Sequence, residues 1–235
     1  MDVSGKKAVI FGGTSGIGLA AAKQLAALGA SVIAISRNPD RAGDLPDGVT
    51  TMQCDVTDRD AVARLCADCA PINILISAAT GGSRAIGPFL KMDLDGYQDS
   101  FQKLWGYANV VRYGTEHVVD GGCITLVSGA PARNCRPGQV SLSSVGGAVE
   151  ALARAVAREI APNKRINVVS PGTIDTPMTS FVGDERKQFY ANATKNNLIP
   201  RAGSADEVAQ GIVYVVQNDF VTGTTIDVDG GWLLA

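Results

Sequence analysis

A glycine-rich turn between a strand and a helix is the feature that most constrains this chain. Residues Lys7–Phe11 form a short apolar run typical of a buried strand, and Leu19–Leu28 carry the apolar stripe of a helix that Gly29 stops. The turn, Phe11–Gly18, reads FGGTSGIG. Backbone N–H groups at a helix N-terminus carry partial positive charge, so such a turn suits a pyrophosphate.

Three glycines have separate expected roles in this turn. Gly12 permits the tight turn, Gly16 lets a ligand approach the backbone, and Gly18 lets helix and strand pack closely. A lone glycine pattern also fits a plain strand-to-helix turn, but the flanking strand and helix favour a nucleotide site. The expected cofactor-binding residues of the turn are Gly12, Thr14, Ser15, Gly16, Ile17 and Gly18.

The glycine spacing resembles the T-G-x-x-x-G-x-G loop of the short-chain dehydrogenase/reductase family, with Phe11 in place of the usual Thr. The resemblance covers nearly the whole chain, which predicts one domain over residues 1–235. Alternating strand and helix patterns predict a single doubly wound α/β Rossmann domain, a mostly parallel seven-stranded sheet with helices on both faces. Such sheets bind ligands at the carboxyl ends of their strands, where the strand order switches.

The expected elements follow from apolar runs and helix signals. After the first strand, further strands are expected at Ser31–Ser36, Val49–Cys54, Ile72–Ser77, Gly122–Ser128, Lys164–Ser170 and Thr224–Asp229. Further helices are expected at Asp58–Ala70, Asp95–Val119 and Leu142–Ile160, and from a capping box at Ser204–Glu207 to about Val216. One face of the second of these helices is expected to carry Phe101, Leu104, Trp105, Ala108 and Val111.

Composition excludes several partners. A net charge of −2 offers no surface for nucleic acid, and no apolar run is long enough to span a bilayer. Five cysteines without a secretion signal predict free thiols in the cytoplasm. Cys66 and Cys69 have metal-ligand spacing, but no second pair accompanies them, so no metal site is expected.

The end of the second strand predicts the choice of nicotinamide cofactor. A carboxylate there would bind the ribose 2′-hydroxyl of NAD, whereas an arginine would accept the 2′-phosphate of NADP. Here the chain has Ser36-Arg37, and a guanidinium suits bidentate phosphate binding. We therefore expect NADP(H), the alternative being that Arg37 is only a solvated loop charge.

The family resemblance implies further cofactor contacts. Asp55-Val56 stands where the family has an acidic residue at the adenine, and Ser77-Ala78-Ala79-Thr80 stands where it has N-N-A-G. The segment after the sixth strand matches P-G-x-x-x-T, which holds the nicotinamide carboxamide in the family. The residues implied there are Pro171, Gly172, Thr173, Ile174 and Thr176.

The resemblance fails at the residues that carry the family's chemistry. That chemistry needs a Tyr as proton donor, a Lys four residues later and a Ser that polarises the carbonyl. Ser128 is present, but the register read from Gly147–Leu152 puts Leu142 at the Tyr position and Gly146 at the Lys position. The family's Asn on the preceding helix, read from Phe101, becomes Leu104.

Substitutes for the missing groups can be named from the sequence but not ranked. Arg133 could stabilise a developing oxyanion or hold an acidic substrate, and it could equally be a surface residue. Ser128 and Arg133 are the expected catalytic residues. Other possible proton sources are Tyr107, Tyr113, Cys135, Asp175 and Tyr190.

Three functions stay open at this stage. The first is an NADP(H)-dependent oxidoreductase that reduces a small activated carbonyl or imine by hydride transfer without the usual Tyr/Lys acid. The others are a non-redox lyase, isomerase or cyclase, and an inactive cofactor sensor or scaffold. The resemblance also implies a homodimer or homotetramer that pairs through Asp95–Val119 and Leu142–Ile160, with Ala148, Ala151, Leu152, Ala155 and Val156 as a small apolar face.

Overall fold

A single sheet of parallel strands forms the centre of the computed structural model, which describes residues 1–235 apart from the side chain of Arg41. The strand order β3-β2-β1-β4-β5-β6-β9 gives seven strands, and every neighbouring pair is parallel. The strands are β1 Lys7–Phe11, β2 Ser31–Ser36, β3 Val49–Gln53, β4 Ile72–Ser77, β5 Val118–Val127, β6 Arg165–Pro171 and β9 Thr225–Val228. The order reverses between β1 and β4, and this is where a nucleotide-binding crevice is expected.

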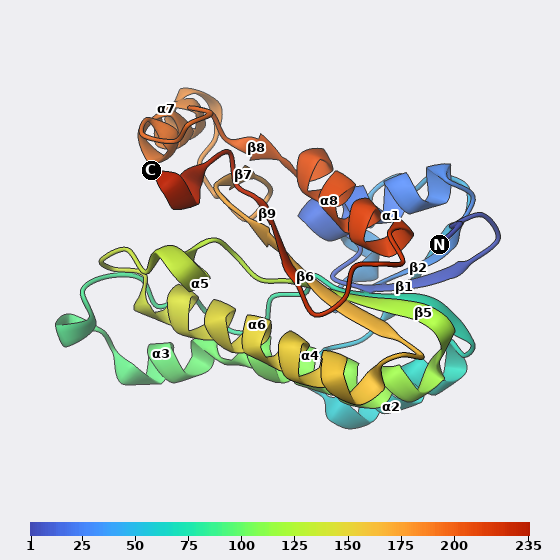
Figure 1. The fold of residues 1–235 in the computed structure, drawn as a ribbon. Coiled ribbons are helices and arrows are strands. Elements are labelled where there is room, and N and C mark those ends of the chain that lie inside the picture. The colour runs from blue at the N-terminus through green and yellow to red at the C-terminus, as the bar shows by residue number, and fades with distance from the viewer.

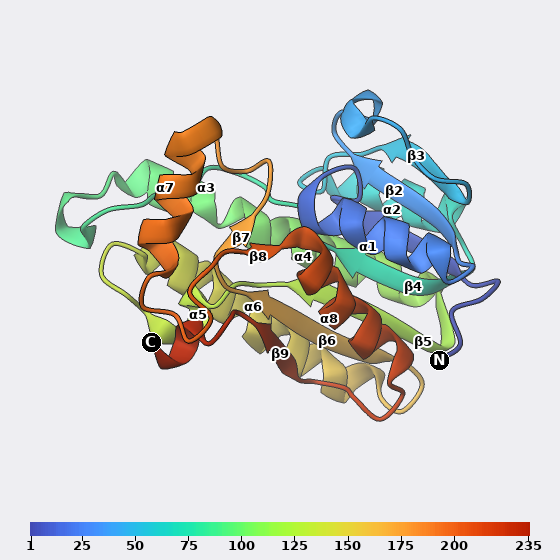
Figure 2. The same ribbon diagram turned by 90° about the horizontal axis from the view of Figure 1, so that it is seen from above.

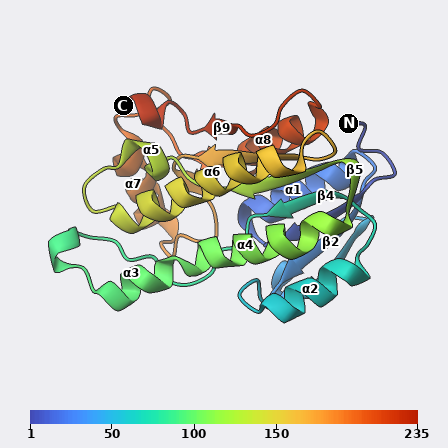
Figure 3. The same cartoon turned by 60° about the horizontal axis from the view of Figure 1, so that its bottom comes forward.

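Helices cover both faces of the sheet (Figure 1). Helices α1 and α8 lie side by side on one face, as Figure 2 shows from above. Helices α2, α4 and α6 lie on the other face, which comes forward in Figure 3. Their bounds are α1 Gly16–Ala27, α2 Arg59–Asp68, α4 Gln102–Gly114, α6 Val140–Ile160 and α8 Ala205–Gln217. Each face has its own cluster of buried apolar side chains, so the predicted doubly wound Rossmann architecture is confirmed.

The expected long helix over Asp95–Val119 is interrupted. Helix α3 spans Leu94–Ser100, Phe101 separates it from α4, and the chain has already entered β5 at Val118. The predicted face was also wrong at one position, because Trp105 is 62 % exposed. The buried face of α4 is rotated about the helix axis from the expected face. It carries Gly106, Tyr107, Val110, Val111 and Gly114.

Several elements at the carboxyl end of the sheet were absent from the sequence-based prediction. Helix α5 (Pro131–Asn134) follows β5 and packs against α6. Two short strands, β7 (Ile174–Asp175) and β8 (Gly203–Ser204), pair in parallel, and α7 (Gly183–Thr194) lies between them in the chain. The capping box at Ser204 was predicted and is confirmed, since Ser204 Oγ accepts from the N–H of Glu207 and its own N–H donates to the Glu207 carboxylate.

The expectation that no apolar run could span a bilayer was wrong for α6, which is long and apolar enough, by length and composition alone, to cross a membrane. In the structure its buried residues, among them Val145, Val149 and Ala153, belong to the face that packs on β6. This placement accounts for its apolar character by core packing, as in any helix that covers a sheet.

Candidate active site

A cavity of about 660 Å³ lies over the glycine-rich turn at the carboxyl ends of β1, β2 and β4. Three glycines of the turn, Gly12, Gly13 and Gly18, leave no room for a side chain. An added Cβ on Gly12, whose φ is +80°, would lie 2.6 Å from the Ala79 nitrogen, and one on Gly18 would lie 2.1 Å from the Gly12 oxygen. An added Cβ on Gly16 would make only an ordinary contact, 3.6 Å from the Thr176 Cβ, although the φ of +51° favours glycine there. The turn is therefore closed toward the protein and open toward the cavity.

Two features of this cavity fit an anionic nucleotide. The first turn of α1 has no acidic residue, and the N-cap residue Ser15 makes no capping side-chain hydrogen bond, so its backbone donors are free to meet a ligand. Among the described residues, the buried Ser36 Oγ has no hydrogen-bond partner although Ser36 lines the cavity. Because Ser36 lines the cavity, its hydroxyl is available to hydrogen-bond a ligand there.

The far end of the same cavity carries one cation and one anion. Arg37 is exposed and lines the cavity directly after Ser36. Asp55, after β3, accepts from the Thr57 N–H at 2.9 Å and from its hydroxyl at 2.8 Å. The backbone hydrogen bond from Thr57 is the main reason why the pKa of Asp55 lies below its usual value. The Asp55 carboxylate is therefore fixed as an acceptor at the cavity wall.

The structure brings together most of the predicted cofactor residues. Those that line the 660 Å³ cavity are Gly12, Thr14, Ser15, Gly16, Ile17, Gly18, Ser36, Arg37, Asp55, Val56, Ala78, Ala79 and Thr176. Pro171 and Gly172 line a second cavity, whereas Thr173 and Ile174 line a third, of about 300 Å³, beside β9. Ser77 is fully buried beneath the site and lines none of the three.

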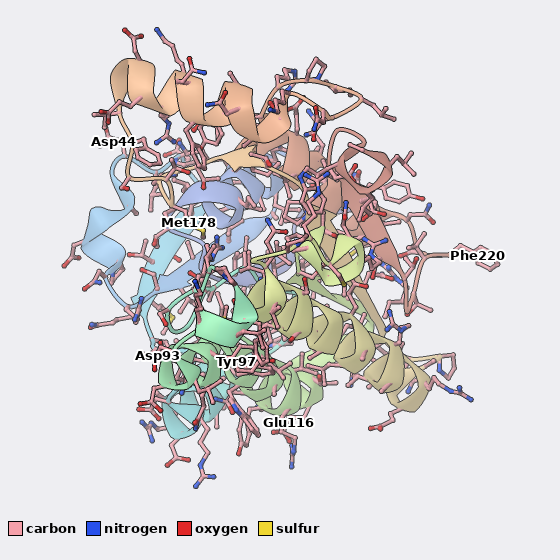
Figure 4. The ribbon with its side chains drawn as sticks, turned by 90° about the vertical axis from the view of Figure 1, so that its left-hand side faces the viewer. Asp44, Asp93, Tyr97, Glu116, Met178 and Phe220 are labelled. Carbon is pink, nitrogen blue, oxygen red and sulfur yellow. The ribbon has the colours of Figure 1, made fainter. Side chains whose placement is uncertain are left out.

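The segment that carries Thr176 is held in place from α7. The Arg186 side chain donates to the backbone oxygens of Thr176 at 2.7 Å and Thr179 at 2.8 Å, and it pairs with the Asp175 carboxylate. Met178 lies on this segment and lines both the first and the second cavity. Figure 4 views this end of the molecule, with Met178 near the middle of the face.

The second cavity, of about 380 Å³, shares Thr80, Gly81, Gly82 and Met178 with the first. Two walls of it come from β5 and β6, through the segments that begin at Ser128 and Pro171. A third wall comes from α6, through Ser141, Leu142, Val145 and Gly146. The two cavities are therefore neighbours that share part of their lining, and the second lies where the resemblance implied the reacting end of the cofactor.

The two α6 positions that the resemblance aligned with the family's Tyr and Lys face this cavity. Leu142 and Gly146 both line it, one helical turn apart. An added Cβ on Gly146 would lie 2.9 Å from the Ala132 Cβ, because α5 packs directly against α6 at this point. A larger side chain at position 146 would therefore require α5 to shift.

The two predicted catalytic residues occupy different surroundings. Ser128 lines the second cavity, but its hydroxyl donates to Glu150 Oε1 at 3.2 Å. Arg133 lines neither cavity; its guanidinium donates to Asp227 Oδ2 at 2.9 Å and pairs with Glu150 at 3.3 Å. The hydrogen bond to Asp227 is the largest cause of the raised pKa of Arg133. In this arrangement Arg133 lies outside both cavities and its guanidinium is engaged with Asp227 and Glu150.

Lys103 is the cavity residue that the sequence reading missed. Its Nζ donates to the Ser128 carbonyl oxygen at 3.1 Å, and the side chain lines the second cavity near the start of α4. Burial lowers the pKa of Lys103 to about 7, with a smaller effect from the nearby charge of Arg84. Helical spacing could have revealed it, since Lys103 lies four residues before the buried Tyr107 on the same face. A lysine on a buried stripe is rare enough to mark a functional site.

The other proton sources named from the sequence lie outside both cavities. Tyr107 is buried and donates to the Val127 oxygen at 3.0 Å, and burial raises its pKa well above the usual value. Tyr190 donates to Thr179 Oγ1 at 2.8 Å. The remaining three, Tyr113, Cys135 and Asp175, line neither cavity. Over the part of the chain that the structure describes, no group of three or more His, Cys, Asp or Glu side chains could hold a metal ion.

A parallel sheet in this strand order, with a glycine turn and an uncapped helix over its crevice, defines a Rossmann-type dinucleotide-binding protein. Sequence comparison then gives the family. Residues 12–233 match the model of the family described as enoyl-(acyl carrier protein) reductase. The chain belongs to this family of short-chain dehydrogenases/reductases.

Three relatives illustrate the breadth of the family around this chain. A 3-oxoacyl-[acyl-carrier-protein] reductase of Mus musculus is 29 % identical, the match covering 96 % of this chain and 97 % of the relative. A small-chain dehydrogenase in complex with NADPH is 27 % identical with a TM-score of 0.83, over 99 % of this chain and 100 % of that one. The MalC reductase/Diels-Alderase from Malbranchea aurantiaca is 26 % identical with a TM-score of 0.87, over 99 % of this chain and 97 % of that one.

Proposed function

We propose that this protein is an NADP(H)-dependent reductase that delivers hydride to a small activated carbonyl or imine without the usual Tyr/Lys acid. The observation that carries the proposal is a second cavity directly beside the first, with Thr80, Gly81, Gly82 and Met178 in the lining of both. The first is shaped for a dinucleotide, and the second is a smaller space against Ser128 and Gly172. A protein that only senses the cofactor would have no use for the second cavity.

The chain's own residues would bind and orient the reactants. The glycine turn and the N-terminus of α1 would hold the pyrophosphate, and Asp55 would stand at the adenine. Thr176 and the backbone near Gly172 would hold the nicotinamide end beside the second cavity. A bound reduced nicotinamide supplies the hydride, and the protein contributes by holding the acceptor carbon close to it and excluding water.

The test of this proposal is a titration followed by a turnover screen. Binding of NADPH and NADH is measured by fluorescence, and NADPH consumption is then followed with 2,3-butanedione, 2-oxo esters, simple ketones and cyclic imines. Turnover of an activated carbonyl or imine is expected. Binding without any turnover would leave a sensor or a non-redox enzyme as the function, and conversion of a compound without NADPH consumption would favour the non-redox enzyme.

The cofactor preference gives a first prediction. NADPH is expected to bind more tightly than NADH, because the Arg37 guanidinium and the unpartnered Ser36 hydroxyl lie together at the ribose end of the cavity. Hydrogen bonds to charged groups contribute about 1.5–3 kcal/mol, so Arg37→Ala should weaken NADPH binding by about 10- to 150-fold. The measurement is the dissociation constant of both cofactors for wild type and variant. Binding of NADH should change little, and equal affinities in wild type would contradict the preference.

A second prediction concerns assembly. We propose a homodimer or homotetramer that pairs through α4 and α6, supported by the exposure of Trp105 on α4 and of Ala151 and Ala155 on α6. Exposed apolar surface along two adjacent helices is typical of a partner interface. Trp105→Glu is expected to shift the mass measured by light scattering toward the monomer. A wild-type protein that is monomeric at micromolar concentration would contradict the proposal.

A further inference from the structure

The second cavity contains two cationic side chains and no acidic one. Arg84 and Lys103 both line it, and its other walls are glycines, serines, prolines, a threonine and apolar residues. Among the described residues, neither cation forms an ion pair with a carboxylate. Lys103 is half-buried and Arg84 is exposed at the mouth of the cavity. Two cations that face one cavity without an acidic neighbour favour a ligand that carries or develops negative charge.

Lys103 is placed to act on a reacting group. Its single hydrogen-bond acceptor among the described residues is the Ser128 carbonyl oxygen at 3.1 Å. The face of the Tyr107 ring lies beneath the ammonium, with 5.5 Å from Nζ to the ring centroid. An ammonium has three donors, so a further N–H is available to a substrate atom in the cavity. The cavity is the one lined by Leu142 and Gly146, where the resemblance implied the proton-transfer groups.

The surroundings also suit Lys103 to proton transfer near neutral pH. Burial and the charge of Arg84 bring the pKa of Lys103 to about 7, in that order of importance. Lys103 also lies in the first turn of α4, and the partial positive charge at this helix end disfavours the ammonium form and so favours a lower pKa. General acids work best when their pKa lies near the operating pH. The other candidate donor, Ser128, has its hydroxyl hydrogen directed to Glu150.

We propose that Lys103 supplies the proton in place of the missing tyrosine, and that the substrate is consequently a neutral carbonyl compound rather than a cationic imine. The proposal rests on the reductase function proposed above. As hydride reaches the carbonyl carbon, the C=O π electrons move onto oxygen, and an N–H bond of the Lys103 ammonium breaks as the new O–H bond forms. The product is an alcohol, the nicotinamide is oxidised, and the neutral amine regains its proton from water. A cationic imine would meet repulsion from Arg84 and Lys103 and would need no such donor.

The test compares Lys103→Met and Lys103→Arg with wild type, using 2,3-butanedione, the cyclic imine 2-methyl-1-pyrroline and NADPH. Lys103→Met should lower kcat for the diketone by about 10²-fold or more, as expected for loss of a general acid, with unchanged NADPH affinity as the check of folding. Lys103→Arg keeps the positive charge, but its guanidinium does not release a proton. Compared with Lys103→Met, the Lys103→Arg variant should therefore restore part of the affinity for the diketone but little of kcat. Lys23→Met, on the exposed face of α1, is the matched control and should leave all values unchanged.

The pH dependence and a direct titration complete the test. Reduction needs the protonated amine, so kcat/KM of wild type should be constant at low pH and fall above about 7, and this inflection should disappear in Lys103→Met. NMR of lysine labelled at Cε should show one signal that titrates near 7 without cofactor and is missing from Lys103→Met. A Lys103 signal that titrates near the ordinary lysine value, full diketone activity in Lys103→Met, or faster reduction of the imine than of the diketone would overturn the proposal. Each of these three results would leave the proposed reductase function intact. Wild-type protein that reduced neither the diketone nor the imine would overturn both the reductase function and the role of Lys103.

Discussion

Gly18→Ala is expected to abolish tight NADPH binding and to destabilise the fold. The added Cβ would lie 2.1 Å from the Gly12 oxygen, 2.7 Å from the Gly12 carbonyl carbon and 3.2 Å from the Gly13 Cα. All three are backbone atoms of the turn that forms the floor of the dinucleotide cavity, so no flexible side chain can move aside. Relief of the clash must shift α1 or unwind the turn, and either movement displaces the N–H groups that would hold the pyrophosphate.

The expected size follows from these contacts. Overpacking costs about 1–3 kcal/mol in ordinary cores and more where the backbone must move, so a loss of about 3 kcal/mol or more in the free energy of unfolding is expected. Misplaced donors should raise the dissociation constant for NADPH by at least about 10²-fold, which corresponds to about 2.7 kcal/mol. Urea unfolding and fluorescence titration measure the two quantities.

Gly147→Ala is the matched control for this substitution. Gly147 lies inside α6, and the nearest atom to an added Cβ is the Ala132 oxygen at 3.9 Å, an ordinary contact. Alanine is favoured over glycine inside a helix by about 1 kcal/mol, so this variant should be as stable as wild type or slightly more so.

NADPH affinity within threefold of wild type in Gly18→Ala would show that the turn does not form the pyrophosphate site.

The central sheet and the helices that cover it were predictable because each of these elements has a local signal in the sequence. The apolar runs at 31–36 and 72–77 reproduce β2 and β4, and the capping box at Ser204 marks the start of α8. The glycine turn placed the cofactor residues because a strand, a turn and a helix in succession fix where the backbone donors point. The dinucleotide half of the site therefore follows from patterns within short segments of the chain.

Features that depend on contacts between distant segments were not predictable. Helix α7 has no apolar stripe, and among its residues only Tyr190 and Thr194 are buried; Arg186 holds it to the segment after β7. The role of Arg133 depends on Asp227, 94 residues away in the chain. Lys103 was passed over because the register was read from Phe101, where α3 ends and α4 begins, and this placed Leu104 at the position of interest.

Arg133→Met is expected to lower the free energy of unfolding by about 3–5 kcal/mol, because it leaves a buried carboxylate without its main partner. The Glu150 side chain is only 4 % exposed, and Arg133 lies 3.3 Å from its Oε1. The remaining contacts of Glu150 are the Ser128 hydroxyl at 3.2 Å and Arg154 at 3.8 Å on the exposed side of α6. Neither replaces a guanidinium that also holds the β9 carboxylate of Asp227 and the Ser170 hydroxyl.

The double variant separates a broken ion pair from lost packing. Replacement of both members of a buried pair by apolar residues of similar size is often neutral, so Arg133→Met with Glu150→Leu should recover much of the stability lost in Arg133→Met. The cycle is measured by urea unfolding of wild type, the two single variants and the double variant. Arg59→Met, which removes an exposed arginine paired with Asp60 at 3.8 Å, is the control and should change stability by less than about 1 kcal/mol. Additive losses in the cycle would show that Arg133 and Glu150 stabilise the protein independently. NADPH affinity should also be followed in each variant, because Ser128, which donates to Glu150, lines the second cavity.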